Sequence, residues 1–193
     1  MLLVWLSTRA QVRGVEVCVS GARSDATQLF EHVARALDLI DTYDAAQGDA
    51  LRRDLKRILI SDSRGGQYLS GIRGCRVGRN YVLRASALEL AMMIVHEGTH
   101  GALEQAGERY RGANKSRVEE KCIEAEIGFA ERVPDSTRAI ERSRRLLETR
   151  WWDVGENVET AVLELKGRGV PGWIARRLVA RAARRERAGP YHR

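Results

Sequence analysis

The fold is decided by the stretch Ile94-Val95-His96-Glu97-Gly98-Thr99-His100-Gly101-Ala102, which lies inside an apolar run. Ser86, followed three residues later by Glu89, predicts a capped helix start, and the helical pattern then continues toward Gly107. Because apolar residues occupy most sides of this helix, we expect it to be buried. The apolar residues are Leu88, Leu90, Met92, Met93, Ile94 and Val95.

Two histidines in this helix have the spacing of a metal site. His96 and His100 are four residues apart, so both imidazoles lie on one face, one turn from each other. Two imidazoles placed in this way can bind one Zn²⁺, and Glu97 lies where its carboxylate can reach a bound water. The alternative is a buried helix whose histidines are satisfied by hydrogen bonds, which is a costly arrangement in such an apolar setting.

Other metal centres fit the sequence less well. A di-iron carboxylate bundle needs a second Glu-x-x-His, and neither His32 nor His192 has a glutamate three residues earlier. The metzincin pattern requires a histidine six residues after His100, where this chain has Ala106. A catalytic zinc still needs a third protein ligand, for which a glutamate from a later helix is the remaining common choice.

The chain resembles the gluzincin branch of the zinc metallopeptidases, the thermolysin and aminopeptidase type, through His96-Glu97-x-x-His100 and the glutamates that follow. The resemblance implies that a glutamate on a later helix completes the zinc site. The family spacing fits both Glu119 and Glu120, which lie nineteen and twenty residues beyond His100. Glu-x-x-Cys-x-x-Ala-Glu, from Glu119 onward, is also similar to small bacterial zincin-like domains of unassigned function, a likeness over residues 94–133.

Helix periodicity favours Glu119 over Glu120 and Glu124 as the third ligand. Glu119 shares its face with apolar positions such as Ile123, whereas Glu120 shares a face with Glu124. We therefore predict that His96, His100 and Glu119 hold Zn²⁺. The alternative role for Glu119 is a capping-box partner of Ser116. Glu126 is our candidate to orient one of the histidines, because Ile123 stands where the thermolysin pattern has an aspartate.

The resemblance also implies an activity. The metal of such a site lowers the pKa of its bound water and polarises a scissile carbonyl, while Glu97 takes the proton and passes it to the leaving amine. The expected function is a zinc-dependent metallohydrolase, most simply a peptidase acting on peptides or proteins. Tyr110 is a candidate oxyanion donor, although Tyr110 and Tyr81 are more simply half-buried aromatic residues. Cys122 is more simply a small buried residue than a ligand.

The order of predicted elements indicates an α+β, zincin-like fold. We predict strands over residues 2–7 and 12–20, with a turn near Arg13-Gly14. Helices are expected from Asp25 to Ile40, around Leu51 and Leu55, and over 116–132, about 135–166 and 171–187, and an apolar run spans 58–60. A glycine-rich stretch of short strands ends with a strand over 79–84, the expected sheet edge for an extended peptide.

The domain division follows the charge. Of the 193 residues, 168–193 contain eight arginines and one acid, Glu186, which account for the whole net charge of +7. We expect a zincin-like domain over 1–167, with the sheet and motif helix in 1–107 and the helical part with the third ligand in 108–167, and a basic C-terminal helix and tail in 168–193. That helix is either a docked helix with a solvated basic face or a site for an anionic partner, DNA or a membrane surface.

The remaining expectations concern context. Three cysteines at no metal-like spacing favour neither a disulfide framework nor a Cys-ligated zinc site, and so point to a cytoplasmic, reducing environment. The apolar run Leu2–Leu6 is too short for a transmembrane segment. A different class of function also stays open: a non-catalytic, regulatory zincin-like domain that binds metal and a protein or nucleic-acid partner.

Overall fold

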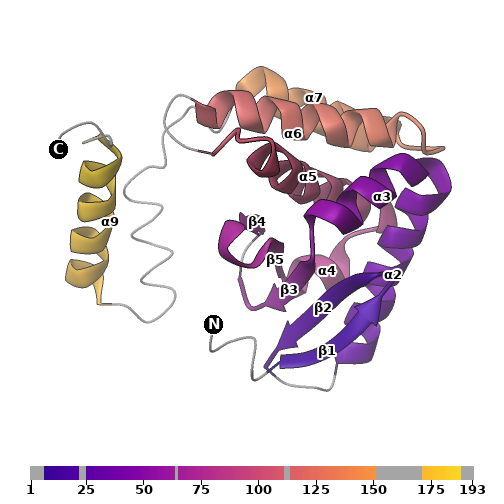
Figure 1. Cartoon of the computed structure of the whole chain (residues 1–193), viewed down its shortest axis with the longest axis horizontal. Coiled ribbons are helices and arrows are strands. Elements are labelled where there is room, and N and C mark those ends of the chain that lie inside the picture. The colour runs from indigo at the N-terminus through magenta and orange to yellow at the C-terminus, as the bar shows by residue number, and fades with distance from the viewer. Residues whose placement is uncertain (1–6, 22–24, 64, 111–113, 151–170, 188–193) are drawn as a thin grey trace. The chain divides into compact units, whose positions relative to one another are not determined.

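The computed structural model describes residues 7–21, 25–63, 65–110, 114–150 and 171–187 (Figure 1). The chain divides into two compact units, residues 1–149 and residues 150–193. The first unit combines a five-stranded mixed sheet with helices, which confirms the α+β class. None of the described helices is both long enough and apolar enough to cross a membrane.

The sheet has the strand order β1-β2-β3-β5-β4. Strands β2, β3 and β5 run parallel to one another, and β1 and β4 pair antiparallel at the two edges. Arg13 and Gly14 connect β1 to β2 with φ values of 48° and 82°, the positive angles that a tight hairpin requires. The strands are Ser7–Val12 (β1), Val15–Ser20 (β2), Arg57–Ser61 (β3), Gly66–Leu69 (β4) and Gly74–Gly78 (β5).

The helices of the first unit follow the predicted pattern in most places. A short 3-10 turn, Ser70–Ile72, precedes β5. The α-helices are Ala26–Tyr43 (α2), Ala45–Asp54 (α3), Arg79–Arg84 (α4), Ala87–Gln105 (α5), Asn114–Ala130 (α6) and Thr137–Thr149 (α7). In the second unit, α9 spans Gly172–Arg187, which confirms the helix predicted to begin at Pro171.

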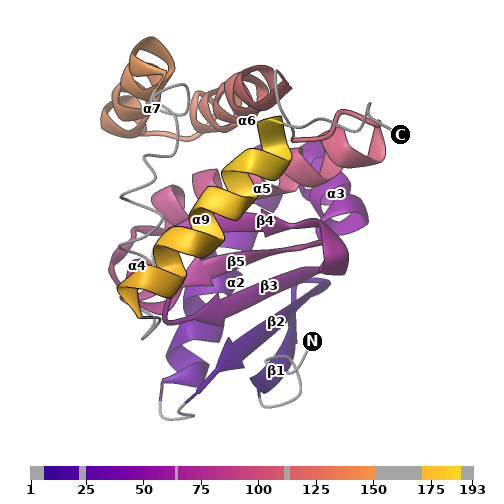
Figure 2. The same ribbon diagram turned by 90° about the vertical axis from the view of Figure 1, so that its left-hand side faces the viewer.

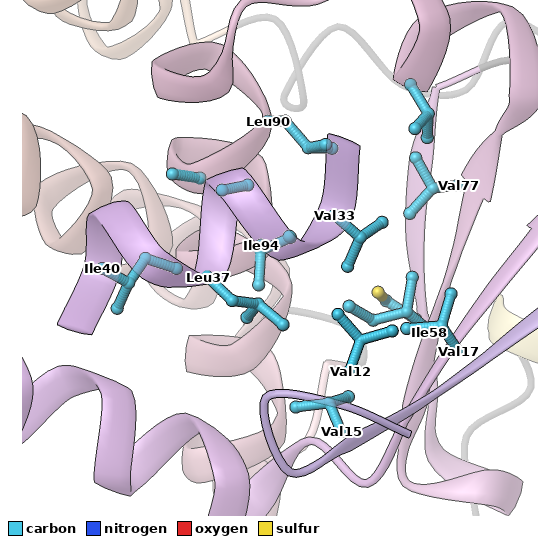
Figure 3. Close-up of a cluster of buried hydrophobic side chains, with 14 of the residues drawn as sticks. Val12, Val15, Val17, Val33, Leu37, Ile40, Ile58, Val77, Leu90 and Ile94 are labelled. Atoms are coloured by element: carbon cyan, nitrogen blue, oxygen red, sulfur yellow. The ribbon is translucent and has the colours of Figure 1, made fainter. Parts of the chain in front are cut away.

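The hydrophobic core lies between one face of the sheet and helices α2 and α5. Alternate residues of β2, including Val17, point into it and meet Ile58 of β3, as the alternation predicts. Figure 3 shows Leu37 of α2 and Ile94 of α5 reaching toward these strands. Leu37 and Ile94 are buried, so the side of α5 that carries Ile94 anchors the helix to the sheet.

A capping box fixes the start of helix α5. Ser86 and Glu89 form the predicted capping box, in which the Ser86 hydroxyl accepts from the Glu89 amide at 3.2 Å. Further along, Gly101 lets α5 approach α3 and β4, because an added Cβ would lie 3.0 Å from the Asp54 carbonyl oxygen and 3.2 Å from the Tyr68 ring. Figure 2 shows β4 as the strand that runs nearest to α5.

The strand predicted over residues 79–84 is wrong, because these residues form α4. Val82 is fully buried, and Tyr81 donates a hydrogen bond to the Glu89 carbonyl oxygen at 3.1 Å. The run Tyr81-Val82-Leu83 is too short for its periodicity to separate a strand from a helix. The edge of the sheet beside α5 is formed by β4 instead.

Other boundaries shift by a few residues. The first strand is Ser7–Val12, so it shares only Ser7 with the predicted strand over 2–7, of which residues 2–6 lie outside the described part of the chain. The predicted strand over 12–20 is divided by the turn at Arg13 and Gly14, and β2 begins at Val15. Helix α6 begins at Asn114, two residues before Ser116. The predicted helix over about 135–166 is described only as α7, up to Thr149, and its remainder lies outside the described residues. Trp173 of α9 is 69% exposed. The anionic partner expected for this basic helix stays a prediction.

The close approach of β5 to β3 at Gly74 gives a test of the fold. A Cβ at this position would lie 2.5 Å from the Arg57 carbonyl oxygen, a backbone atom that the sheet holds in place. We expect Gly74→Ala to lower the free energy of unfolding by about 1–3 kcal/mol, the usual cost of overpacking. Urea unfolding followed by circular dichroism measures this change.

Gly71→Ala is the matched control, because nothing lies within 4 Å of a Cβ at that position. We expect it to change the free energy of unfolding by no more than about 0.5 kcal/mol. Equal stability of the two variants would contradict the described β3–β5 pairing.

Candidate metal centre

Helices α5 and α6 bring two histidines and a glutamate together. The Nε2 atom of His96 lies 3.4 Å from Oε2 of Glu119, and the Nε2 atom of His100 lies 3.8 Å from Oε1 of the same carboxylate. The two imidazole ring centres are 5.0 Å apart. Glu119 is only 5% exposed, so its carboxylate faces the histidines from the inner side of α6. We refer to His96, His100 and Glu119 as the candidate metal centre.

Glu97 lies beside this centre and faces β4. Glu97 is 5% exposed. A Cβ added at Gly66 of β4 would come within 2.7 Å of the Oε1 atom of Glu97. The same added atom would lie 3.0 Å from Sδ of Met93, one turn earlier on α5. The absence of a side chain at Gly66 therefore makes the space that the Glu97 carboxylate occupies against the edge strand.

Burial and local charge shift the pKa values of the site in different directions. Burial raises the pKa of Glu97 to about 7, with the charge of His96 acting against it. Burial lowers the pKa of His100 to about 4, and the nearby His96 charge adds to this effect. Burial also lowers the pKa of His96, but contacts with the carboxylates of Glu119 and Glu126 outweigh it and raise the value to about 10.

Glu119 is held in its ionised form. Burial alone raises the pKa of its carboxyl group, but the contacts with His96 and Tyr110 outweigh burial and lower the pKa below its ordinary value. An ionised, buried carboxylate is an oxygen donor suited to Zn²⁺. Glu120 is half-buried and Glu124 is exposed, so neither glutamate shares the inward position of Glu119.

The capping-box alternative for Glu119 does not agree with this placement. Helix α6 begins at Asn114, so Ser116 lies within the first turn of the helix rather than before it. The Glu119 carboxylate reaches across to the imidazoles of α5.

Two tyrosines flank His100. The ring of Tyr68, in β4, is stacked at 6.4 Å between ring centres, and the ring of Tyr110 meets His100 edge-on at 5.3 Å. Tyr110 is 43% exposed, so this ring lies at the surface beside His100. Tyr81 instead donates a hydrogen bond to the Glu89 carbonyl oxygen. Sequence reasoning missed Tyr68, whose four-residue strand carries too little periodicity to be recognised.

Cys122 is a second candidate for the third ligand. Its Sγ atom and one nitrogen from each of His96 and His100 all lie within 4.8 Å of one another. This cluster favours Cys122 as the third ligand, whereas the distances from Glu119 to the two imidazoles favour Glu119. We favour Glu119, because its ionised carboxylate lies 3.4 Å and 3.8 Å from the Nε2 atoms of the two imidazoles.

The residues present fit a zinc ion. Glu97 Oε2 and Glu119 Oε2 are buried without a hydrogen-bond partner among the described residues, although Glu119 Oε2 lies in ion-pair range of His96. Buried carboxylate oxygens are costly unless a positive charge or a donor compensates them. Two imidazole nitrogens and one carboxylate oxygen form a donor set that zinc prefers.

Comparisons with protein-family models, with curated proteins and with solved structures find no match for this chain. The geometry of the candidate metal centre is therefore the basis for assigning a function.

The raised pKa of His96 predicts a pH dependence for the metal-free protein. A folded-state value of about 10, above the ordinary 6.5, means that protonated His96 stabilises the fold fully below pH 6.5 and that this contribution is lost as the pH rises through about 10. We expect the urea midpoint of the chelator-treated protein to fall across this window.

His96→Gln is the control, because its side chain does not titrate. The variant should show a smaller fall in midpoint over the same pH range. If the two proteins lose stability in parallel, proton binding at His96 is not coupled to folding in the way described.

Proposed function

We propose that the protein is a zinc-dependent hydrolase, and most simply a peptidase. The observation that carries this proposal is the convergence of His96, His100 and Glu119 beside the buried carboxylate of Glu97. His96, His100 and Glu119 would hold the metal. When bound, zinc supplies a Lewis acid that polarises a carbonyl group and lowers the pKa of a water molecule.

Glu97 has the properties of a general base. Its Oε2 atom is buried without a hydrogen-bond partner among the described residues, and burial raises its pKa to about 7, close to neutral pH, in the metal-free protein. A group with such a pKa can both accept and release a proton during turnover. Glu97 would take a proton from water at Oε2 and deliver it to the leaving group. Tyr110 lies beside His100, where its contact with Glu119 would help to orient that carboxylate as a ligand.

The edge strand β4 supports a peptide or protein as the substrate. Among the described strands it pairs only with β5, and it borders Glu97 through Gly66 and His100 through Tyr68. An extended peptide can add to the edge of a sheet through main-chain hydrogen bonds, with its side chains alternating between the two faces. A substrate strand paired in this way would pass beside Glu97 and His100.

A second candidate function is a non-catalytic metal-binding domain. The observation that favours it is the position of Cys122, which is close enough to His96 and His100 to offer a fourth protein ligand. Four protein ligands characterise closed structural zinc sites, whereas a catalytic site keeps one position open. A hydroxamate inhibitor that displaces water from the metal separates the two functions, because it binds only to an open site.

The ligand set predicts one zinc ion per chain. Glu119→Gln should lose most of the bound zinc after dialysis, because it removes the charged oxygen donor that faces both imidazoles. Glu120→Gln is the matched control on the next residue of α6 and should keep the ion. Elemental analysis of the purified proteins measures the stoichiometry, and a wild-type protein that never retains zinc overturns the proposal.

Glu97→Gln should retain zinc but lose activity. We expect hydrolysis of a fluorogenic peptide library to fall by about 10²–10⁴-fold, the usual contribution of general acid–base catalysis. The amide is close in size to the carboxylate, so the fold should be preserved. Activity equal to that of the wild-type protein, with zinc still bound, would exclude Glu97 as the base.

A further inference from the structure

Helix α6 presents a second buried carboxylate to the candidate metal centre. Glu126 lies two turns after Glu119 on the inner face of the helix, and both residues are buried. The Oε2 atom of Glu126 is 3.5 Å from Nδ1 of His96, while Oε2 of Glu119 is 3.4 Å from Nε2 of the same ring. The His96 imidazole is therefore placed between two carboxylates of one helix.

The two histidines of the centre have different surroundings. Aromatic rings flank His100, whereas carboxylates flank His96 at both of its nitrogens. Ile123, one turn before Glu126 on α6, is buried and apolar, so it offers His96 no acceptor. Glu126 is the carboxylate at the Nδ1 side of His96.

An imidazole that binds a metal through one nitrogen carries its proton on the other. An acceptor for that proton fixes both the tautomer and the orientation of the ring, and such partners are often carboxylates. We infer that Glu126 is a positioning residue that accepts the Nδ1 proton of His96 and so directs Nε2 toward Glu119 and the metal. This inference rests on the proposed metal site, and it assigns to Glu126 no contact with the substrate.

The separation of 3.5 Å is that of an ion pair rather than a short hydrogen bond. Hydrogen bonds in such sites are often long before the ligand binds and tighten when it does.

Two neutral variants of similar size separate positioning from a general loss of charge. Glu126→Gln keeps an oxygen that can accept from Nδ1, and Glu126→Leu removes the acceptor. The probe is Zn²⁺ alone, bound to the purified full chain in competition with a chromophoric chelator. We expect Glu126→Leu to weaken zinc binding by about 10–100-fold, as loss of such partners does, and Glu126→Gln to weaken it much less.

Glu124→Gln is the control, because Glu124 is exposed on the same helix. It should bind zinc as the wild-type protein does. Equal zinc affinities for the Gln and Leu variants would overturn the inference, because the acceptor would then have no effect. A wild-type protein that binds no zinc would instead overturn the proposed function, so the two failures are distinguishable.

Nitrogen NMR of the histidine rings gives a readout that does not depend on affinity. In the zinc-loaded wild-type and Glu126→Gln proteins, His96 should carry its proton on Nδ1 with Nε2 bound to the metal. If Glu126→Leu does not fold, the nitrogen that binds the metal in the wild-type and Glu126→Gln proteins still tests the assignment. Metal bound at Nδ1 of His96 in either protein contradicts the assignment.

Discussion

The structure depends on one constraint, which is that helix α5 buries charged and polar groups inside an otherwise apolar interior. Glu97 on α5 and Glu119 on α6 are each only 5% exposed, and His96 lies close to Glu119. Buried carboxylates need compensating charge or donors. The imidazoles of α5 compensate the Glu119 carboxylate, whereas β4 only leaves space at Gly66 for Glu97, whose Oε2 atom has no hydrogen-bond partner among the described residues.

The same helix links the fold to the chemistry. Leu90 and Ile94 lie in the core with the strands and with α2, so one side of α5 is anchored over the sheet. The histidines point from another side of α5 toward α6. Because the anchoring residues and the ligands belong to one rigid helix, packing against the sheet also sets where the imidazoles stand. Rigid elements hold functional groups more accurately than loops do.

The motif helix and the inner face of α6 could be predicted from the sequence, because each has a strong local signal. The Ser86–Glu89 capping box, the apolar run and the inward face of Glu119 all follow from helical periodicity and are found in the structure. That Glu119 ligates zinc stays a prediction. Glu126, which we chose as the candidate to orient a histidine because Ile123 replaces the aspartate of the thermolysin pattern, lies in ion-pair range of His96.

The strands around the site could not be predicted in the same way. Residues 79–84 form a helix because tertiary contacts, with Val82 buried and Tyr81 bonded to Glu89, decide the state of a short apolar run. Tyr68 reaches His100 only because β4 pairs with β5 at the sheet edge, a pairing that depends on residues distant in the sequence. Local patterns carry little information about such contacts.

The central claim is that His96, His100 and Glu119 bind one metal ion beside Glu97. A crystal structure of the zinc-loaded protein, with anomalous differences measured at the zinc absorption edge, tests it most directly. The account predicts a single strong anomalous peak about 2.0–2.1 Å from a nitrogen of each histidine and about 2.0–2.2 Å from an oxygen of Glu119. A peak bound to other residues, or none at this position, would contradict it.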